Sequence, residues 1–295
     1  MENIKIAEVC GLCAGCKRAI ITANEELKNG KSVTIFKEIV HNKNVNNSLI
    51  CAGAKFEDNI QNLKSNDTVI IRAHGEPPET YEYFKTHNIT FKDCTCFNVE
   101  KIHNLVEEYS NNGFKIIILG KSKTTIHPEV LGTMGWAFGN YILVEDADDL
   151  NKLTNIKNEK LYLVCQTTFN IKKAEKLIEQ IQTITNSNGC EIVINKSICN
   201  AQKQINLSSA ELAKNSDTMI VVGGKNSSNS IELFNNVNSI CPSIFIEDID
   251  DWKSAFDSSN ISISKNTKIG ITAGASTNKD ELFALKQKIE DYLRG

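Results

Sequence analysis

Short apolar runs rich in β-branched residues alternate with longer amphipathic stretches along the whole chain. In those stretches apolar side chains recur at i, i+3, i+4 and i+7, which predicts helices such as the one containing Ala174, Leu177, Ile178 and Ile181. Continuous apolar strands that alternate with such helices are typical of parallel sheets covered on both faces, so the pattern predicts an α/β fold. The predicted strands are 4–9, 33–40, 68–71, 115–119, 141–144, 161–164, 191–194, 218–222, 243–246 and 268–272.

Histidines, hydroxyl residues and small polar residues follow many of these strands. Open α/β sheets place their chemistry at the carboxyl ends of the strands, so these residues are candidates for a binding or catalytic site. The candidates by this criterion are His41, His74, His127 with Glu129, Thr167, the segment 223–230, and the segment 272–276.

Three cysteines, Cys13, Cys96 and Cys199, lie where a predicted strand gives way to a helix, about a third of the chain apart. Three such thiolates can hold an iron–sulfur cluster by three corners and leave one iron open to a reactant. Spacing alone does not select among the cysteines, because Cys10, Cys13 and Cys16 also have the C-x₂-C-x₂-C spacing of half a ferredoxin motif. A zinc ribbon is disfavoured, since no second CxxC is present.

Composition narrows the class of protein. The 295 residues include ten cysteines, and no secretion signal precedes the first predicted strand, so we expect a cytoplasmic protein with reduced thiols rather than a disulfide framework. A net charge of -3 gives no reason to expect nucleic acid as a partner. The apolar runs are too short to cross a membrane. The length is compatible with two domains, and one or three are also allowed.

The segment 223–230, with sequence GGKNSSNS, combines small residues with many hydrogen-bond donors at a helix start. That combination favours an anion site, although a helix cap and turn would use the same residue types. Each of His41, His74 and His127 is compatible with a zinc ligand, a phosphate donor, an acid–base group or a structural residue. We interpret His87 and His103 as structural.

Taken together, the motifs resemble those of the 4-hydroxy-3-methylbut-2-enyl diphosphate reductases, which catalyse the last step of the methylerythritol phosphate route to isoprenoids. The resemblance covers the chain from Ile6 to Leu293, and the order of the longer blocks makes it specific. The motifs are Gly-Leu-Cys13-Ala-Gly, Val-His41-Asn, Ala-His74-Gly, Cys-Thr-Cys96, His127-Pro-Glu129-Val-Leu-Gly-Thr-Met-Gly, Gln166-Thr-Thr, Lys-Ser-Ile-Cys199, Val-Val-Gly-Gly-Lys-Asn-Ser-Ser-Asn-Ser and Thr-Ala-Gly-Ala-Ser276.

The resemblance implies three small α/β lobes with mainly parallel sheets, in a trefoil-like arrangement around a central 4Fe–4S cluster. The implied lobes are 14–96, 97–196, and 197–295 together with 1–13. It also implies that Cys13, Cys96 and Cys199 are the cluster ligands, one from each lobe, and that Cys10, Cys16 and Cys94 are not.

The implied reaction removes the hydroxyl group of an allylic diphosphate and gives isopentenyl diphosphate and dimethylallyl diphosphate. The family's acid–base positions fall on Glu129, Thr167 and His127, and a ferredoxin or flavodoxin type of protein is the implied electron donor. The diphosphate-binding positions that the resemblance implies are His41, His74, His127, Thr167, Ser227, Ser228, Asn229 and Ser276.

The chain departs from the family pattern in the loop 120–127, which is longer than usual, and at Phe97 and Asn278, where prolines are common. Two alternatives stay open from the residues alone. The first is another three-cysteine 4Fe–4S enzyme that acts as a Lewis acid, such as a dehydratase or a quinolinate synthase-like protein. The second is a non-catalytic protein that binds a phosphate ligand and contains a structural metal.

Overall fold

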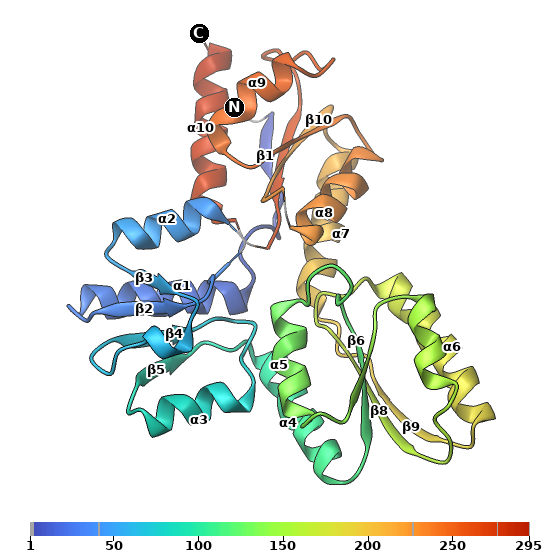
Figure 1. The fold of residues 1–295 in the computed structure, drawn as a ribbon. Coiled ribbons are helices and arrows are strands. Elements are labelled where there is room, and N and C mark those ends of the chain that lie inside the picture. The colour runs from blue at the N-terminus through green and yellow to red at the C-terminus, as the bar shows by residue number, and fades with distance from the viewer. Residues whose placement is uncertain (1–2, 41, 226, 276, 295) are drawn as a thin grey trace. The chain divides into compact units, whose positions relative to one another are not determined.

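The protein is built on three four-stranded sheets with helices between the strands (Figure 1). The computed structural model describes residues 3–40, 42–225, 227–275 and 277–294, and of Ser228 the backbone only. Eight of the strand pairs in these sheets have a described register, and all eight are parallel, as the apolar strand pattern predicts. The α/β fold class is therefore confirmed.

Two compact units make up the chain. The first consists of residues 1–27, 38–56 and 200–295, and the second of residues 28–37 and 57–199. Both units are discontinuous in sequence because the chain passes between them several times.

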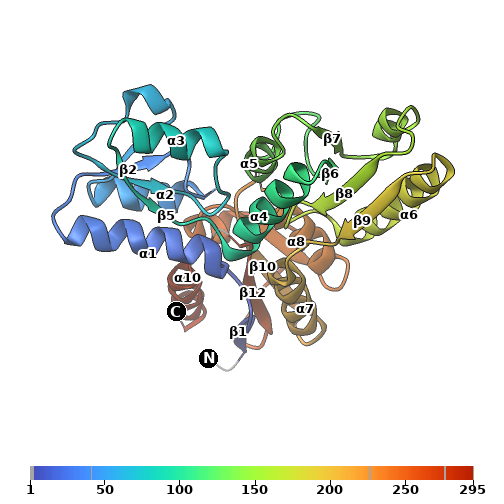
Figure 2. The same cartoon turned by 90° about the horizontal axis from the view of Figure 1, so that it is seen from below.

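One sheet belongs entirely to the first unit, and it has the strand order β1-β12-β10-β11. Alternate residues of its strands face opposite sides, so Ile220 and Val222 pack with α9 and α10, whereas Met219 and Val221 pack with α7 and α8. Figure 2 shows α7 and α10 on either side of the strands β1 and β12. The elements are β1 (Ile4–Ile6), α7 (Asn200–Lys214), β10 (Thr218–Val222), α8 (Ser228–Asn238), β11 (Ser243–Ile246), the 3-10 helix η3 (Ile249–Asp251), α9 (Trp252–Asp257), β12 (Ile269–Ala273) and α10 (Lys279–Arg294).

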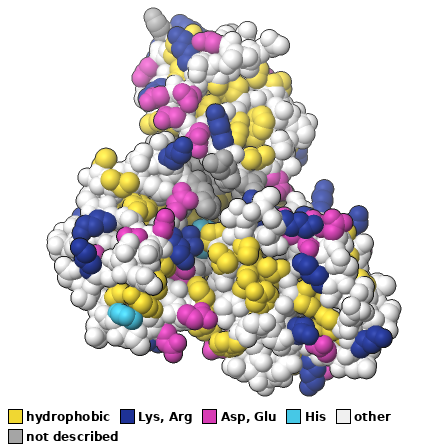
Figure 3. Space-filling model, in the orientation of Figure 1, with side chains coloured by type: hydrophobic (Ala, Val, Ile, Leu, Met, Phe, Trp, Pro, Cys, Tyr) yellow, Lys and Arg dark blue, Asp and Glu magenta, His cyan; other side chains and the backbone are white. Residues whose placement is uncertain are grey.

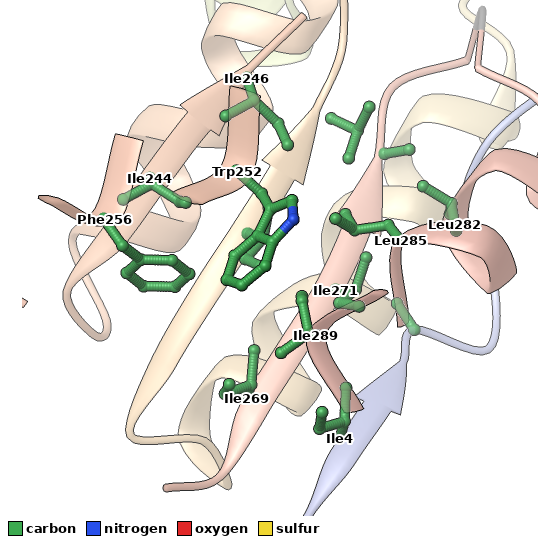
Figure 4. Close-up of a cluster of buried hydrophobic side chains, with 14 of the residues drawn as sticks. Ile4, Ile244, Ile246, Trp252, Phe256, Ile269, Ile271, Leu282, Leu285 and Ile289 are labelled. Atoms are coloured by element: carbon green, nitrogen blue, oxygen red, sulfur yellow. The ribbon is translucent and has the colours of Figure 1, made fainter. Parts of the chain in front are cut away.

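Helix α10 closes the core of this sheet. Its buried residues Leu282, Leu285, Ile289 and Leu293 have the helical spacing that the sequence predicts. Figure 4 shows Leu282, Leu285 and Ile289 pointing toward Ile271 of β12, with Trp252 of α9 in the same cluster.

A second sheet has the order β3-β2-β4-β5. Phe84 of α3 packs against Phe36 and Phe91 in its apolar core. The elements in this part of the chain are α1 (Ala14–Lys28), β2 (Val33–Phe36), α2 (Lys43–Cys51), β3 (Lys55–Glu57), the 3-10 helix η1 (Ile60–Asn62), β4 (Thr68–Ile71), α3 (Pro78–Thr86) and β5 (Thr90–Asp93).

The third sheet lies in the second unit and has the order β7-β6-β8-β9. Ile116 and Ile118 of β6 pack with α4 and α5, whereas Ile117 and Leu119 pack with α6. Figure 1 shows α4 and α5 on one side of this sheet and α6 on the other. The elements are α4 (Phe97–Asn111), β6 (Lys115–Leu119), α5 (Pro128–Trp136), β7 (Tyr141–Val144), the 3-10 helix η2 (Ala147–Leu153), β8 (Lys160–Cys165), α6 (Ile171–Ser187) and β9 (Glu191–Asn195).

All ten predicted strands are present, and the differences are local. The strand predicted at 33–40 ends at Phe36, because Lys37 has a left-handed backbone (φ 64°) that ends the extended conformation. Strands β3 and β5 were not predicted from the sequence. Both are edge strands with mostly exposed or half-buried side chains, so they lack the apolar signal of a buried strand.

Candidate functional site

Each of the three candidate cluster ligands stands immediately before the first residue of a helix. Cys13 precedes α1, Cys96 is the N-cap of α4, and Cys199 precedes α7. All three are half-buried, and neither they nor the other seven cysteines form disulfides. A cysteine that binds iron carries a negative charge, and the positive end of a helix dipole stabilises a negative charge placed there. The local setting of all three residues therefore fits the donor chemistry of an iron–sulfur cluster.

Among the three candidate ligands, Cys13 is the one with a clearly lowered thiol pKa. A hydrogen bond from the Cys16 side chain lowers the pKa of Cys13 to about 6, with help from backbone N–H groups at the helix start and against the effect of burial. The C-x₂-C spacing brings these two residues together because residues three apart lie on one side of a helix turn. The contact gives Cys16 a role in the setting of Cys13 that spacing by itself did not predict.

Three of the remaining cysteines behave as buried apolar residues. Burial raises the pKa of Cys10, of Cys241 and, to about 12, of Cys165. The Cys10 thiol donates to the carbonyl oxygen of Ala7 at 3.1 Å. These groups are held in the thiol form, which is a poor metal ligand.

Within the second unit, two of the candidate ligands are hydrogen-bonded to loops that carry other candidate residues. The Cys96 N–H donates to the Ala73 carbonyl oxygen at 2.9 Å, next to His74, and the Cys199 N–H donates to the Thr167 carbonyl oxygen at 2.8 Å. Both bonds join segments that follow the carboxyl ends of strands, as the strand-end argument predicts. In neither unit do the described side chains form a group of three or more potential ligands close enough to hold a metal ion.

Glu129 and Thr167 form a buried pair. Glu129 is 2% exposed and lies in the first turn of α5, and Thr167 follows β8. The Thr167 N–H donates to Oε1 of Glu129 at 2.5 Å, and the Thr167 hydroxyl donates to Oε2 at 2.7 Å. Burial raises the pKa of Glu129 to about 7, although both hydrogen bonds favour the ionised form. A carboxyl group poised near neutral pH is suited to general acid catalysis.

His127 is the N-cap of α5, and its Nδ1 accepts a hydrogen bond from the Glu129 N–H at 3.2 Å. The His127 ring lies edge-on to the ring of His74, with 5.3 Å between the ring centroids. The loop before His127, which the sequence led us to expect to be longer than usual, is closed by a bond from the His127 N–H to the Lys121 carbonyl oxygen at 3.0 Å. His127 lies at the start of the helix that carries Glu129.

The glycine- and serine-rich loop after β10 lies in the first unit. Ser227 is the N-cap of α8 and accepts from the Ser230 N–H at 3.4 Å, so the helix-cap role is present. Gly223 and Gly274 both approach Ser230 so closely that an added Cβ would overlap its side chain. Asn229 is half-buried in the first turn of α8.

Some predicted residues fall where nothing can be tested. His41 and Ser276 lie outside the described residues, and so does the side chain of Ser228. The neighbour of His41 is described: the Asn42 side chain caps α2 by accepting from the N–H groups of Asn44 and Val45.

Sequence reasoning missed a buried ionic cluster next to His74. Glu76 is 1% exposed and contacts both Lys37 and Arg72. These three residues form no sequence motif, and Lys37 lies far from Glu76 in the sequence. The only signal in the sequence was that Glu76 directly follows the Ala-His74-Gly motif. His103, interpreted as structural, is 3% exposed and stacks on Trp136. Burial lowers the pKa of His103 to about 4.

None of the described helices is long and apolar enough to cross a bilayer. Acidic and basic side chains are interspersed over the described face seen in Figure 3.

Comparison with known proteins identifies the relatives of the chain. The model of the LytB protein family matches residues 4–290. A 4-hydroxy-3-methylbut-2-enyl diphosphate reductase of Clostridioides difficile is 36% identical over 280 residues, covering 93% of this chain and 94% of the relative. The enzyme of the same name from Caldanaerobacter subterraneus subsp. tengcongensis is 36% identical over 293 residues, covering 98% and 96%.

Solved structures agree with the sequence matches. A structure of (E)-4-hydroxy-3-methyl-but-2-enyl diphosphate reductase, described as the terminal enzyme of the non-mevalonate pathway, is similar with a TM-score of 0.75 and 31% identity, covering 98% of this chain and 99% of that one. The Plasmodium falciparum reductase is similar with a TM-score of 0.81 and 27% identity, covering 99% and 88%. The resemblance seen in the sequence is thereby confirmed, and the chain belongs to the LytB family, the family of the 4-hydroxy-3-methylbut-2-enyl diphosphate reductases.

Proposed function

We propose that this chain is a 4-hydroxy-3-methylbut-2-enyl diphosphate reductase. The reaction consumes two electrons and two protons, releases the substrate hydroxyl as water, and gives isopentenyl diphosphate and dimethylallyl diphosphate. Full-length similarity to reductases of that name supports the proposal. The structural observation that carries it is the buried Glu129–Thr167 pair, which provides a carboxylic acid for the departing oxygen.

Glu129 is the proposed proton donor. Loss of a hydroxyl group requires a proton, and a carboxyl group with a pKa of about 7 is partly protonated at neutral pH. Thr167 orients the carboxyl group through two hydrogen bonds, and its hydroxyl can relay a proton. His127 holds the start of α5 through its Nδ1 and is proposed to contact the substrate as well.

The proposed cofactor is a 4Fe–4S cluster with Cys13, Cys96 and Cys199 as its ligands. When bound, such a cluster supplies a Lewis-acidic iron without a cysteine ligand and passes electrons one at a time. The position of each cysteine before the first residue of a helix, where the helix dipole stabilises negative charge, supports this ligand set. The chain divides, in this proposal, into lobes 14–96, 97–196, and 197–295 with 1–13.

The proposed diphosphate site uses His41, His74, His127, Ser227, Ser228, Asn229 and Ser276, with Thr167 beside the reacting end of the substrate. Hydroxyl, amide and imidazole donors hold a diphosphate without a metal ion of its own. Gly223 and Gly274 support this role for the loop after β10, because their missing side chains let its backbone pack tightly against Ser230. Fixing the diphosphate also fixes the hydroxyl end, which lowers the entropic cost of the reaction.

The reaction requires an external reductant. We infer a small redox protein of the ferredoxin or flavodoxin type, and we expect the enzyme to work in the cytoplasm, where thiols stay reduced.

Turnover of oxygen-free protein tests the proposal. Protein purified anaerobically is mixed with 4-hydroxy-3-methylbut-2-enyl diphosphate and a reduced donor, and the two products, the oxidised donor, iron and acid-labile sulfide are measured. We expect two electrons consumed for each product formed. Conversion of the substrate to a product that is not reduced, without consumption of the donor, would instead indicate a dehydratase-type enzyme. Zinc in place of iron and sulfide, with no turnover, would indicate a non-catalytic binding protein.

A further inference from the structure

Glu76 lies two residues after His74 and is almost completely buried, with 1% of its surface exposed. Its Oε2 lies 2.6 Å from the Lys37 Nζ, and its Oε1 lies 3.2 Å from the Arg72 Nε. Burying a carboxylate is costly unless the group is paired and hydrogen-bonded. Here each oxygen of the one carboxylate faces a cation, so the charge of Glu76 is paired on both sides.

The two cations come from neighbouring strand ends. Phe36 and Ile71 are register partners in the parallel pair of β2 and β4, and Lys37 and Arg72 are the next residues of the two strands. Lys37 is fixed by its left-handed backbone and by a bond from its N–H to the Glu57 carbonyl oxygen at 2.9 Å. The Glu76 side chain therefore ties the loop after β4 back to the rim of the sheet.

The backbone of the same loop is tied to α5. The Trp136 Nε1–H donates to the Glu76 carbonyl oxygen at 3.1 Å. Gly135 lies so close to Pro77 that an added Cβ would overlap the proline ring. Helix α5 begins with Pro128 and Glu129, so these contacts connect the loop that carries His74 to the helix that carries the proposed proton donor.

Gly75 makes the turn between the two anchors. It has a left-handed backbone (φ 71°), and its N–H donates to the Arg72 carbonyl oxygen at 3.1 Å. The ring of His103 occupies the space that a side chain at Gly75 would need. The loop from Arg72 to Pro77 is thus fixed at its side chains and its backbone, and His74 lies in the middle of it.

We propose that Glu76 is a positioning residue for His74: it holds the Arg72–Pro77 loop so that the His74 imidazole is already placed to bind the diphosphate group. The inference rests on the proposed function, in which His74 is a diphosphate donor. Placement before binding matters because ordering a loop on binding reduces the affinity that the new contacts provide. Arg72 and Lys37 serve Glu76 as anchors in this arrangement.

The test is the affinity of the cluster-loaded protein for inorganic diphosphate, measured by calorimetry for Glu76→Gln. The substitution keeps the shape of the side chain and removes its charge. If charge alone mattered, the extra net positive charge would tighten binding of the anion. If positioning matters, the substitution should instead weaken the binding of diphosphate. We expect roughly tenfold weaker binding, which corresponds to the free energy of one modest hydrogen bond. The sign of the change separates the two explanations.

Two further variants complete the set. Trp136→Phe keeps an aromatic ring against His103 but removes the donor to the Glu76 carbonyl oxygen, so it should also weaken diphosphate binding. Glu159→Gln is the matched control, since it removes a carboxylate from the partly exposed Lys115–Glu159 pair, whose side chains are 26% and 40% exposed. The control should bind diphosphate with unchanged affinity. The cluster spectrum should be the same in Glu76→Gln, Trp136→Phe and Glu159→Gln. In Glu76→Gln and Trp136→Phe, KM for the substrate should rise by a larger factor than kcat falls.

Unchanged or tighter diphosphate binding by Glu76→Gln would overturn the inference. If that variant does not fold, unchanged binding by Trp136→Phe would overturn it. His74→Ala separates this failure from failure of the proposed function. If His74→Ala weakens binding and Glu76→Gln does not, only the positioning role is wrong. If wild-type protein binds no diphosphate, or if His74→Ala binds as wild type does, the proposed anion site itself is wrong.

Discussion

The protonation state of Glu129 should control the pH dependence of turnover. Burial raises its pKa from 4.5 to about 7, which corresponds to about 3 kcal/mol against the ionised form. About half of the molecules then carry the protonated acid at pH 7, and about one in ten does so at pH 8. If Glu129 is the proton donor, kcat at saturating substrate should be nearly constant below pH 7 and fall about tenfold for each pH unit above it.

Two substitutions test this reasoning. Glu129→Gln cannot donate the proton, so kcat should fall by about 100-fold to 10,000-fold while diphosphate affinity is kept. Thr167→Val removes the hydroxyl donor to Oε2, which favours the ionised carboxylate, so the pKa of Glu129 should rise and the fall in kcat should move to higher pH. Thr168→Val is the control, because the Thr168 hydroxyl accepts from Gln166 at 2.7 Å and has no bond to Glu129 in the described hydrogen bonds.

The assay is product formation from saturating substrate between pH 6 and pH 9, with a chemically reduced donor and iron content checked at each pH. The reasoning is refuted if Glu129→Gln turns over within a few-fold of wild type. It is also refuted if the residual activity of that variant keeps the same decline above pH 7, since another group would then be titrating.

Three other predictions follow from the described side chains. The cluster iron content should fall in Cys13→Ser, Cys96→Ser and Cys199→Ser. It should not fall in Cys10→Ser, because the Cys10 thiol is buried and donates to the carbonyl oxygen of Ala7. A normal iron content in all three ligand variants would contradict the ligand set. Asn229→Ala should weaken binding of inorganic diphosphate with little effect on the cluster spectrum, and unchanged affinity would place the anion site elsewhere. Burial lowers the pKa of His103 from 6.5 to about 4, so its contribution to stability is present above pH 6.5 and is lost as the pH falls toward 4. The melting temperature of wild type should therefore decline more steeply over that range than that of His103→Gln, and parallel declines would show that His103 does not titrate there.

The sequence predicted the buried part of the fold well, because apolar strands and amphipathic helices leave a periodic signal. The strands at 115–119 and 218–222 match the structure residue for residue, and the four leucines and isoleucines of α10 are buried as their spacing predicts. Strands β3 and β5 escaped prediction because an edge strand with exposed side chains has no such period. The early end of β2 depends on one left-handed residue, Lys37, for which the sequence carries no signal.

The sequence identified several residues of the candidate site but not the contacts between them. The strand-end argument found Glu129 and Thr167 separately, and the structure shows that they are partners. It could not find Glu76, because a buried carboxylate is recognised by its partners, and Lys37 is brought to it only by the pairing of β2 with β4. The contact between Cys13 and Cys16 was likewise hidden, since the same spacing is read first as a metal motif.

The parallel pairing of β1 with β12 has a consequence for biogenesis. Ile4 is synthesised well before its partner Ile269, because nearly all of the described chain lies between them. Segments of a nascent chain generally fold in the order of synthesis, but β1 cannot pair until β12 has been made. Leu12 and Cys13 donate backbone hydrogen bonds to the carbonyl oxygens of Thr277 and Ala275, so the proposed ligand Cys13 reaches its final setting only after that segment has been made. Loading of the proposed cluster should accordingly come after the synthesis of residues 275–277.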